Sequence, residues 1–550
     1  MTFGEIAAAA AQIKPPRNVE LKSPQSWKLI GTPQRRLDVA GKVTGEAVYG
    51  IDVRLPDMLY AAVRQSPVLK GKLQSVDRTK LIRRKGVRHV VELEDSVAVV
   101  AENWWVAKQA LADLDVIWHD GENASLSNED IAQLLLNGLT RQGAGAGRTQ
   151  GDFDTTFARA HRQIEADYIV PFLAHVTMEP QNATAYVHDN QVDVWAPTQN
   201  AEGTMAAAAN AAGVRISNVL VHQTAVGGGF GRRDFTQDFV SLAVRIAKHV
   251  PHPVKVIWTR EEDIQHDFYR PMVASRMRAG LDEDGYPVAW HVRLSGPSLL
   301  DVMSLARVDK HIQQGFLEDM PYDIANYRVD HAPCKIPVPV GPWRGMHHSQ
   351  NCFFKECFID ELAHAAQEDP YLYRLGLLRG HPQADRLVAT LNAAATRAGW
   401  GSQLPSDIHR GIAMHETHGT YTAAVVEASV RGQLRVHRVV TAIDCGTAVN
   451  PLTIQMQVES ATVWALSAAI YGEITYQQGR VQQSNFDDYP VLRLSETPII
   501  ETVVVPGGGA FSGVGEPPVV AVAPALCNAI FAATGKRIRS LPLKNQSFHV

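Results

Sequence analysis

The stretch VHQTAVGGGFGRRDFTQDFVSLAVRIAKHV, residues 221 to 250, decides the fold class because a strand pattern passes through three glycines into a helix pattern that we expect to begin near Asp234. Glycines at such a junction let the backbone approach a ligand and present free amides to it, and a helix N-terminus adds positive potential. The stretch lacks the GK[ST] ending of a Walker loop and the glycine spacing of a Rossmann fingerprint. The pattern leaves a ligand-binding loop and a tight structural turn as equal alternatives, and Arg232 and Arg233 favour a ligand that carries phosphate.

Strand and helix patterns alternate along the rest of the chain, which predicts an α+β protein with four regions. Residues 1 to 30 combine an alanine-rich helical turn with proline breaks, which is typical of a connecting segment. Residues 31 to 145 form a small mixed region. The glycine-rich stretch at residues 142 to 152 neither follows a clear strand nor precedes an apolar helix, so we interpret it as a linker. Two larger regions follow, at residues 160 to 395 and 396 to 550.

Composition excludes several classes of protein. The 550-residue chain has a net charge of -4 and no long block of Lys and Arg, so nucleic acid is not expected as a partner. No run of about 18 uncharged apolar residues stands out, and the N-terminus does not resemble a signal peptide. We therefore expect a cytoplasmic protein. The five cysteines are an odd number scattered through a large chain, which indicates reduced thiols rather than a disulfide framework.

Local patterns that suggest a metal site lack the required spacing. Cys352 and Cys357 have no further C-x2-C partner, so two core cysteines are favoured over an iron-sulfur site. The HETH of residues 415 to 418 does not have the H-E-x-x-H spacing of a zinc protease. His347 and His348 are adjacent and point in different directions on a strand, which favours surface or capping roles over a paired metal site.

Several segments together resemble the molybdenum-binding subunits of the xanthine oxidase family, in the branch of isoquinoline 1-oxidoreductase beta subunits and bacterial aldehyde dehydrogenases. Six motifs occur in the order seen in that family, which makes chance agreement improbable. They are HVTMEPQNATAYV (175 to 187), GGGFGRR (227 to 233), VGPWRGM (340 to 346), IDCGTAVNP with QVES (443 to 460), YGEITYQQGRV (471 to 481) and GVGEPP (513 to 518).

The resemblance implies a small hammerhead-like domain at residues 31 to 145, followed by two larger α+β molybdopterin-binding domains. It also implies a cofactor, molybdopterin cytosine dinucleotide, whose molybdenum carries oxo and sulfido ligands and takes none from the protein. The implied activity is a molybdenum hydroxylase that oxidises an aldehyde, or hydroxylates an N-heteroaromatic compound at an electron-poor carbon, with water as oxygen source. The alternative is a non-catalytic scaffold or assembly subunit of such a complex.

Glu516 matches the catalytic base of the family, which removes the proton from the attacking oxygen. A carboxylate between Gly515, Pro517 and an apolar helix is expected to be partly desolvated, which makes it a better base. The competing interpretation is that Glu516 only caps the helix expected at residues 519 to 533. By the same resemblance the cofactor-contacting residues are Gly228, Gly229, Phe230, Gly231, Arg344, Gly345, Gln457 and Gly515.

Two departures from the family affect substrate and cofactor. Asp234 stands where purine-oxidising relatives have a substrate-contacting glutamate, and its shorter reach favours an aldehyde or another N-heteroaromatic substrate over a purine. Ser460 stands where many relatives have glycine.

The partners follow from what the chain lacks. Relatives carry a further N-terminal segment with a motif that contacts the pterin, and we expect a separate chain to supply it. The electrons must leave through other cofactors, so we expect a small partner with [2Fe-2S] clusters, together with a cytochrome c or another electron acceptor. A signal-bearing partner could carry the complex to the periplasm, which is the alternative to the cytoplasm.

Overall fold

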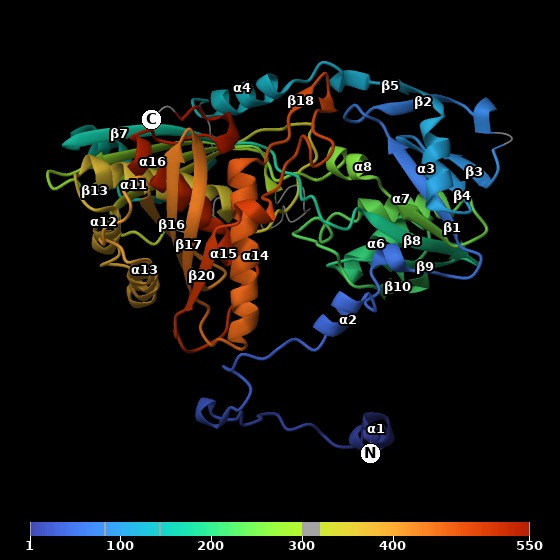
Figure 1. Ribbon diagram of the computed structural model, residues 1–550, viewed down its shortest axis with the longest axis horizontal. Coiled ribbons are helices and arrows are strands. Elements are labelled where there is room, and N and C mark those ends of the chain that lie inside the picture. Colours follow the sequence, from blue (N-terminus) through green and yellow to red (C-terminus); the bar gives the residue numbers. More distant parts are fainter. Residues whose placement is uncertain (1, 82–83, 142–144, 300–319, 549–550) are drawn as a thin grey trace.

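The computed structural model shows two lobes that meet along the middle of the molecule (Figure 1). It describes residues 2–81, 84–141, 145–299 and 320–548. The N-terminal segment extends away from both lobes, and its helix α1 (Phe3–Ala10) has no buried residue. The segment first contacts the body where the amide of Gly31 donates to the carbonyl of Val449 at 3.0 Å.

One lobe is built on a seven-stranded sheet. Three of its strands lie between residues 59 and 101, and the other four lie between residues 182 and 257. In spatial order its strands are β10 (Val219–Gln223), β9 (Gln191–Ala196), β8 (Asn182–His188), β11 (Val254–Ile257), β1 (Leu59–Gln65), β4 (Ser96–Ala101) and β3 (Val87–Glu92). Strand β1 runs parallel to β11, with Leu59 opposite Val254. The small N-terminal region therefore shares one continuous sheet with the region that carries the glycine loop.

The two faces of this sheet bury alternate residues of the same strands, as the twofold period of a strand requires. Ala61 and Val63 pack with helices α6 (Ala201–Ala212) and α7 (Asp238–Ala247). Ala62, between them, packs in a separate cluster with helix α3 (Trp104–Ala112). Helix α7 is suited to this position because seven of its ten residues are buried.

The other lobe contains the largest hydrophobic core of the described residues, between two further sheets and their helices. One sheet has the order β6 (Gly145–Gln150), β14 (Asn326–Pro333), β13 (Pro287–Gly296), β12 (Val273–Leu281) and β7 (Arg162–Val170). The other has the order β15 (His409–Thr417), β16 (Thr420–Arg431), β17 (Gln433–Asp444) and β20 (Ile499–Val504). Helices packed into this core include α11 (His348–Ala365), α12 (Pro370–Leu377), α13 (Ala384–Ala398) and α16 (Val522–Thr534).

Helix α16 packs closely against the last sheet because strand β15 has a glycine at the contact. A Cβ atom at Gly411 would lie 2.2 Å from the carbonyl oxygen of Ala525 and 2.2 Å from the amide of Ala529. Helix α14 (Pro451–Ile470) stands beside this sheet, on the side that faces the other lobe (Figure 1).

Shorter elements connect these layers. They are α2 (Val39–Thr44), β2 (Lys72–Asp77), β5 (Asp115–His119), α4 (Asn128–Gly138), α5 (Phe153–Arg159), α8 (Arg260–Gln265), β18 (Tyr476–Gln477), β19 (Arg480–Val481) and α15 (Pro517–Val520).

The structure bears on the expectations about membrane spans, the glycine-rich stretch and the cysteines. The stretch Pro517–Thr534 is long and apolar enough to cross a membrane by composition, contrary to the expectation from the sequence, but 72% of it is buried inside the fold. That burial is what a core helix shows. The glycine-rich stretch expected to be a linker is largely strand β6, which pairs with β14, while residues 142 to 144 lie outside the described residues. All five cysteines are buried and free, as expected.

Candidate active site

The glycine loop after strand β10 is held in an unusual backbone conformation. Gly228 and Gly231 each have φ of 103°, and Phe230 between them has φ of 56°. A Cβ atom at Gly231 would lie 2.1 Å from the carbonyl oxygen of Pro342, so only glycine fits there. Within the described part of the chain, the amides of Gly228, Gly229 and Phe230 have no hydrogen-bond partner. The loop therefore presents three consecutive donors that no described residue engages, an arrangement that suits an anionic or oxo ligand.

The helix after this loop begins later than expected. Helix α7 starts at Asp238, not near Asp234, because the intervening residues form turns. The amide of Asp234 donates to the carbonyl of Gly231 at 3.3 Å, and the amide of Arg232 donates to the carbonyl of Gly229 at 2.9 Å. The N-terminus of the helix is therefore four residues further from the glycines, which weakens its contribution to a ligand at the loop.

The expectation that Arg232 and Arg233 favour a phosphate is wrong, because both guanidinium groups are buried against carboxylates of the protein. Arg233 donates to Glu179 at 2.9 Å, and burial lowers its pKa. Arg232 donates to Asp238 at 2.6 and 2.9 Å. Burial lowers the pKa of Arg232, but the facing carboxylates outweigh that effect and hold it above its ordinary value. Neither side chain is available to a phosphate.

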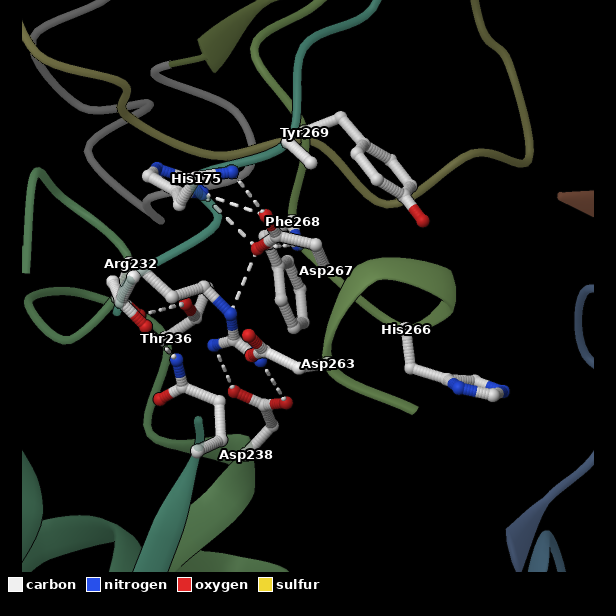
Figure 2. A network of polar contacts seen from close by, with 12 residues as sticks. His175, Arg232, Thr236, Asp238, Asp263, His266, Asp267, Phe268 and Tyr269 are labelled. Atoms are coloured by element: carbon white, nitrogen blue, oxygen red, sulfur yellow. Dashed lines mark hydrogen bonds and ion pairs between the residues drawn. The ribbon is translucent and has the colours of Figure 1, made fainter. Parts of the chain in front are cut away.

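Figure 2 shows that Arg232 belongs to a buried network that joins three segments of the chain. Asp267 lies 2.7 Å from the Nε atom of Arg232 and accepts from the amide of His175 at 2.6 Å. The His175 ring contacts Asp267 through Nδ1 at 3.0 Å and the carbonyl of Pro342 through Nε2 at 2.8 Å. Burial raises the pKa of Asp267, but His175 and Arg232 more than offset this, so it lies below its ordinary value. The network fixes the glycine loop relative to the loop at residues 340 to 346.

Arg344 joins that second loop to helix α14 and to the loop before α15. Its Nε donates to the carbonyl of Gly515 at 2.6 Å, and Nη1 donates to Ser460 at 3.0 Å. Its Nη2 donates to the side chain of Gln457 at 3.0 Å. Burial lowers the pKa of Arg344 to about 10, and the negative charge of Glu516 opposes that shift. Three of the predicted cofactor-contacting residues are therefore joined by direct hydrogen bonds.

Glu516 is oriented by the same loop. Its Oε1 accepts from the amide of Gly345 at 3.0 Å, and Gly345 has φ of 90°, a conformation that suits glycine. Glu516 occupies the N-cap position of helix α15, but its side chain makes no capping hydrogen bond, so the capping interpretation is not supported. The side chain is 40% exposed, and its Oε2 lies 3.6 Å from the Nε2 of His418.

Asp234 lies within electrostatic range of Glu516. Burial raises the pKa of Asp234, a hydrogen bond with Asn200 opposes the rise, and the charge of Glu516 adds to it. The predicted substrate residue and the predicted base therefore act on each other electrostatically. Aromatic rings pack beside the glycine loop: Phe230 stacks on Trp464 of α14 at 4.0 Å between ring centroids, and the rings of Trp464 and Trp343 lie 5.7 Å apart.

The sequence does not reveal several residues of this site. His175 lies within a quoted motif that gives it no role, and nothing in the sequence around Trp464 or Asp267 singles them out. The expectation of a surface or capping role is wrong for His348, which is buried, and burial lowers the pKa of both His347 and His348 to about 3. In the described part of the chain no group of three or more His, Cys, Asp or Glu side chains is arranged to hold a metal ion.

These residues fit a cofactor that brings its own metal ligands. The free amides of the glycine loop can face an anionic or oxo group, and the backbone at Gly515 is bare, since no atom lies within 4 Å of the position of a Cβ there. Arg344 and Gln457 add polar groups from the other side.

Comparison with known proteins gives the same class. The profile of the molybdopterin cofactor-binding domain matches residues 140–376, and that of a second molybdopterin cofactor-binding domain matches residues 386–498. The beta chain of isoquinoline 1-oxidoreductase from Brevundimonas diminuta is 30% identical over 96% of this chain and 69% of its own length. A membrane-bound aldehyde dehydrogenase of Gluconacetobacter polyoxogenes is 28% identical over 99% of this chain and 76% of its own length.

Solved structures show the same fold. The aldehyde oxidoreductase of Desulfovibrio gigas superposes with a TM-score of 0.79 at 16% identity, over 98% of this chain and 82% of that chain. Quinoline 2-oxidoreductase of Pseudomonas putida 86 gives a TM-score of 0.79 at 14% identity, over 94% of this chain and 97% of that chain. The chain belongs to the xanthine oxidase family of molybdopterin-binding oxidoreductases.

Proposed function

We propose that this chain is the catalytic subunit of a molybdenum hydroxylase that oxidises an aldehyde, or hydroxylates an N-heteroaromatic compound at an electron-poor carbon. The observation that carries the proposal is the position of Glu516, whose Oε1 accepts from the amide of Gly345 while its side chain stays 40% exposed. The competing scaffold role does not require a carboxylate oriented in this way. The molybdenum cofactor, when bound, supplies the two-electron acceptor and the oxygen that is transferred.

The side chains of the protein then have separate tasks. Glu516 accepts the proton at its Oε2, because Oε1 is engaged by the backbone. The amides of Gly228, Gly229 and Phe230 donate to an oxygen of the cofactor. Arg344 keeps the carbonyl of Gly515 and therefore the base in place. Removing a proton with a positioned base contributes typically about 100- to 10,000-fold to a rate.

The dinucleotide form of the cofactor is supported by a second glycine loop. Within the described residues, the amides of Gly508 and Gly509 have no hydrogen-bond partner. The hydroxyl of Thr447 holds this loop by donating to the carbonyl of Gly509 at 2.6 Å. Helix α14 begins nearby at Pro451, so its N-terminus favours a negative charge at this place. We propose that phosphates of a molybdopterin cytosine dinucleotide bind here.

Asp234 favours a neutral substrate. Burial and the charge of Glu516 raise the pKa of Asp234, so a further negative charge is unfavourable beside it. A substrate that carries its own carboxylate would be repelled by Glu516 and would lose affinity.

The same site also indicates partners. Met178, Phe235 and Phe511 are 73%, 45% and 70% exposed and stand next to residues of the site in the chain. We propose that further polypeptide covers this side, in the form of a separate chain, and that a small [2Fe-2S] subunit and a cytochrome c or another acceptor take up the electrons. Co-expression of this chain with such partners should raise molybdenum per chain towards one and bring iron into the complex. Stoichiometric molybdenum and turnover in the purified chain without any other polypeptide would contradict the covering chain and the iron-sulfur partner.

The test of the catalytic role is Glu516→Gln in the complex. Glutamine keeps the hydrogen bond from Gly345 through its carbonyl oxygen but cannot accept the proton, so turnover should fall by about 100- to 10,000-fold. Molybdenum content and the urea midpoint of unfolding should stay unchanged. Glu283→Gln, at an exposed turn far from the site in the chain, is the matched control and should keep full turnover. Near-normal turnover of a molybdenum-loaded Glu516→Gln complex would favour another base.

A further inference from the structure

The turn between strands β15 and β16 places a histidine in a conformation that histidine rarely adopts. Thr417 pairs with Thr420, so His418 and Gly419 form a two-residue hairpin loop. Their φ angles are 53° and 73°, which is the pattern of a type I′ turn. Asn-Gly or Gly-Gly is the usual sequence of such a turn, because the first position also requires a left-handed backbone. A non-glycine residue held there next to a site points to a function of its side chain.

The side chain of His418 faces the predicted base. Its Nε2 atom lies 3.6 Å from the Oε2 of Glu516, the carboxylate oxygen that Gly345 does not occupy. The two side chains are 45% and 40% exposed, so both reach solvent as well as each other. His418 thus offers the base a titratable neighbour that is itself in contact with solvent.

A buried chain of hydrogen bonds lies behind His418. Its ring is 5.3 Å from the ring of His348, in an edge-on arrangement. The Nδ1 of His348 lies 3.2 Å from the Nε2 of His415, and the Nδ1 of His415 lies 3.0 Å from the Nζ of Lys355. His348, His415 and Lys355 are 5%, 0% and 1% exposed.

Lys355 determines which atom donates in each of these hydrogen bonds. An ammonium group can only donate, so the Nδ1 of His415 accepts and its Nε2 carries the proton. That proton is donated to the Nδ1 of His348, and the remaining proton of His348 is then on Nε2. Burial and the neighbouring His418 and Lys355 lower the pKa of His348 to about 3, so its ring is neutral at working pH. With its Nδ1 engaged and its Nε2 protonated, His348 does not take a proton that arrives from His418.

We propose that His418 is the acid-base partner of Glu516: its neutral imidazole takes the proton that Glu516 has accepted, restores the carboxylate, and releases the proton to water. His348, His415 and Lys355 are positioning residues. Their hydrogen bonds leave His348 without a site for the proton of His418, so that proton passes to solvent and not into the protein. The inference rests on the proposed role of Glu516 as the base. Glu516, His347 and His348 are the charged and titratable groups that face His418, and His415 and Lys355 lie behind His348. Asp234 and Arg344 act on Glu516.

The first test exploits the turn. His418→Asn and His418→Gly both suit a left-handed position, so neither should lower the urea midpoint. If His418 moves the proton, both variants should lose about 10- to 100-fold in kcat in dilute buffer, at the low end of acid-base contributions. Added imidazole should restore the turnover of His418→Gly in proportion to its concentration. Unchanged kcat in both variants, or a loss that imidazole does not restore, would overturn the proposal.

The second test needs no turnover. Carbethoxylation by diethylpyrocarbonate, followed by peptide mass spectrometry, labels exposed neutral imidazoles, so His418 should react while buried His348 and His415 do not. Glu516→Gln removes the anion 3.6 Å from the Nε2 of His418, so the rate of labelling of His418 at about pH 6 should change by roughly 1.5- to 5-fold, the range of an exposed ion pair. Glu283→Gln should not change the rate.

The outcomes separate the two proposals. An unchanged labelling rate in a Glu516→Gln chain that has lost turnover would overturn the pairing and keep the role of Glu516. Full turnover of Glu516→Gln would remove the base itself and with it the pairing.

Discussion

Replacing Gly231 by alanine should separate the two loops that form the site. Gly231 has φ of 103°, which costs an alanine about 1–2 kcal/mol. The new Cβ would lie 2.1 Å from the carbonyl oxygen and 2.8 Å from the carbonyl carbon of Pro342. These are backbone atoms of a loop tied down by His175, so they cannot move aside as a flexible side chain does. Overpacking of this kind adds about 1–3 kcal/mol, so the free energy of unfolding should fall by about 2–5 kcal/mol.

Gly213→Ala is the matched control for this change. Gly213 ends helix α6 with φ of 79°, and no atom lies within 4 Å of the position of its Cβ. It should show the conformational cost alone, about 1–2 kcal/mol. Urea unfolding followed by tryptophan fluorescence reports on both, because Trp343 and Trp464 lie beside the glycine loop. The molybdenum content of the complex should fall only for Gly231→Ala. Equal destabilisation by the two variants would show that contact with Pro342 does not matter.

Two further predictions concern charge. Arg344→Lys keeps the positive charge but can make only about one of the three hydrogen bonds to Gly515, Ser460 and Gln457. The free energy of unfolding, measured by urea titration, should therefore fall by about 1–3 kcal/mol. The control Arg435→Lys, at an exposed position, should leave it unchanged. His348 has a pKa of about 3 in the folded protein and an ordinary value of 6.5. Between these pH values the unfolded chain binds a proton at His348 that the folded chain does not, so the urea midpoint should fall as the pH is lowered from about 6.5 to 3. The fall should be smaller in His348→Asn.

The sequence groups several residues that the structure also brings together. Gly231 and Gly345 both have a positive φ, and a Cβ atom at Gly231 would overlap Pro342. Such constraints require glycine at these positions, and the glycines can be recognised in the sequence. The resemblance groups Arg344, Gln457 and Glu516, and the structure brings the first two into hydrogen-bond contact and the third beside them.

The sequence is not sufficient to choose partners for charged groups. Arg232 and Arg233 look like anion-binding residues until the fold brings Asp267 and Glu179 to them from more than 30 residues away. The pattern around His418 excludes a zinc protease by its spacing, yet its position before a glycine between two strands is also a turn signal. The sequence also does not show that the helix starts at Asp238, because the turns of residues 231 to 237 have no distinct composition.

The parallel pairing of β1 with β11 has a consequence for synthesis. Leu59 and Val254 are partners, so about 195 residues separate the two strands along the chain. At about 5–20 residues per second, a ribosome needs roughly 10 to 40 s to extend from one to the other. Throughout that time one edge of β1, an apolar strand, has no neighbour, although β4 and β3 on its other edge are already made. An open edge of this kind can pair with another nascent chain. The early part of the sheet therefore depends on being kept apart from other copies until strand β11 has left the ribosome.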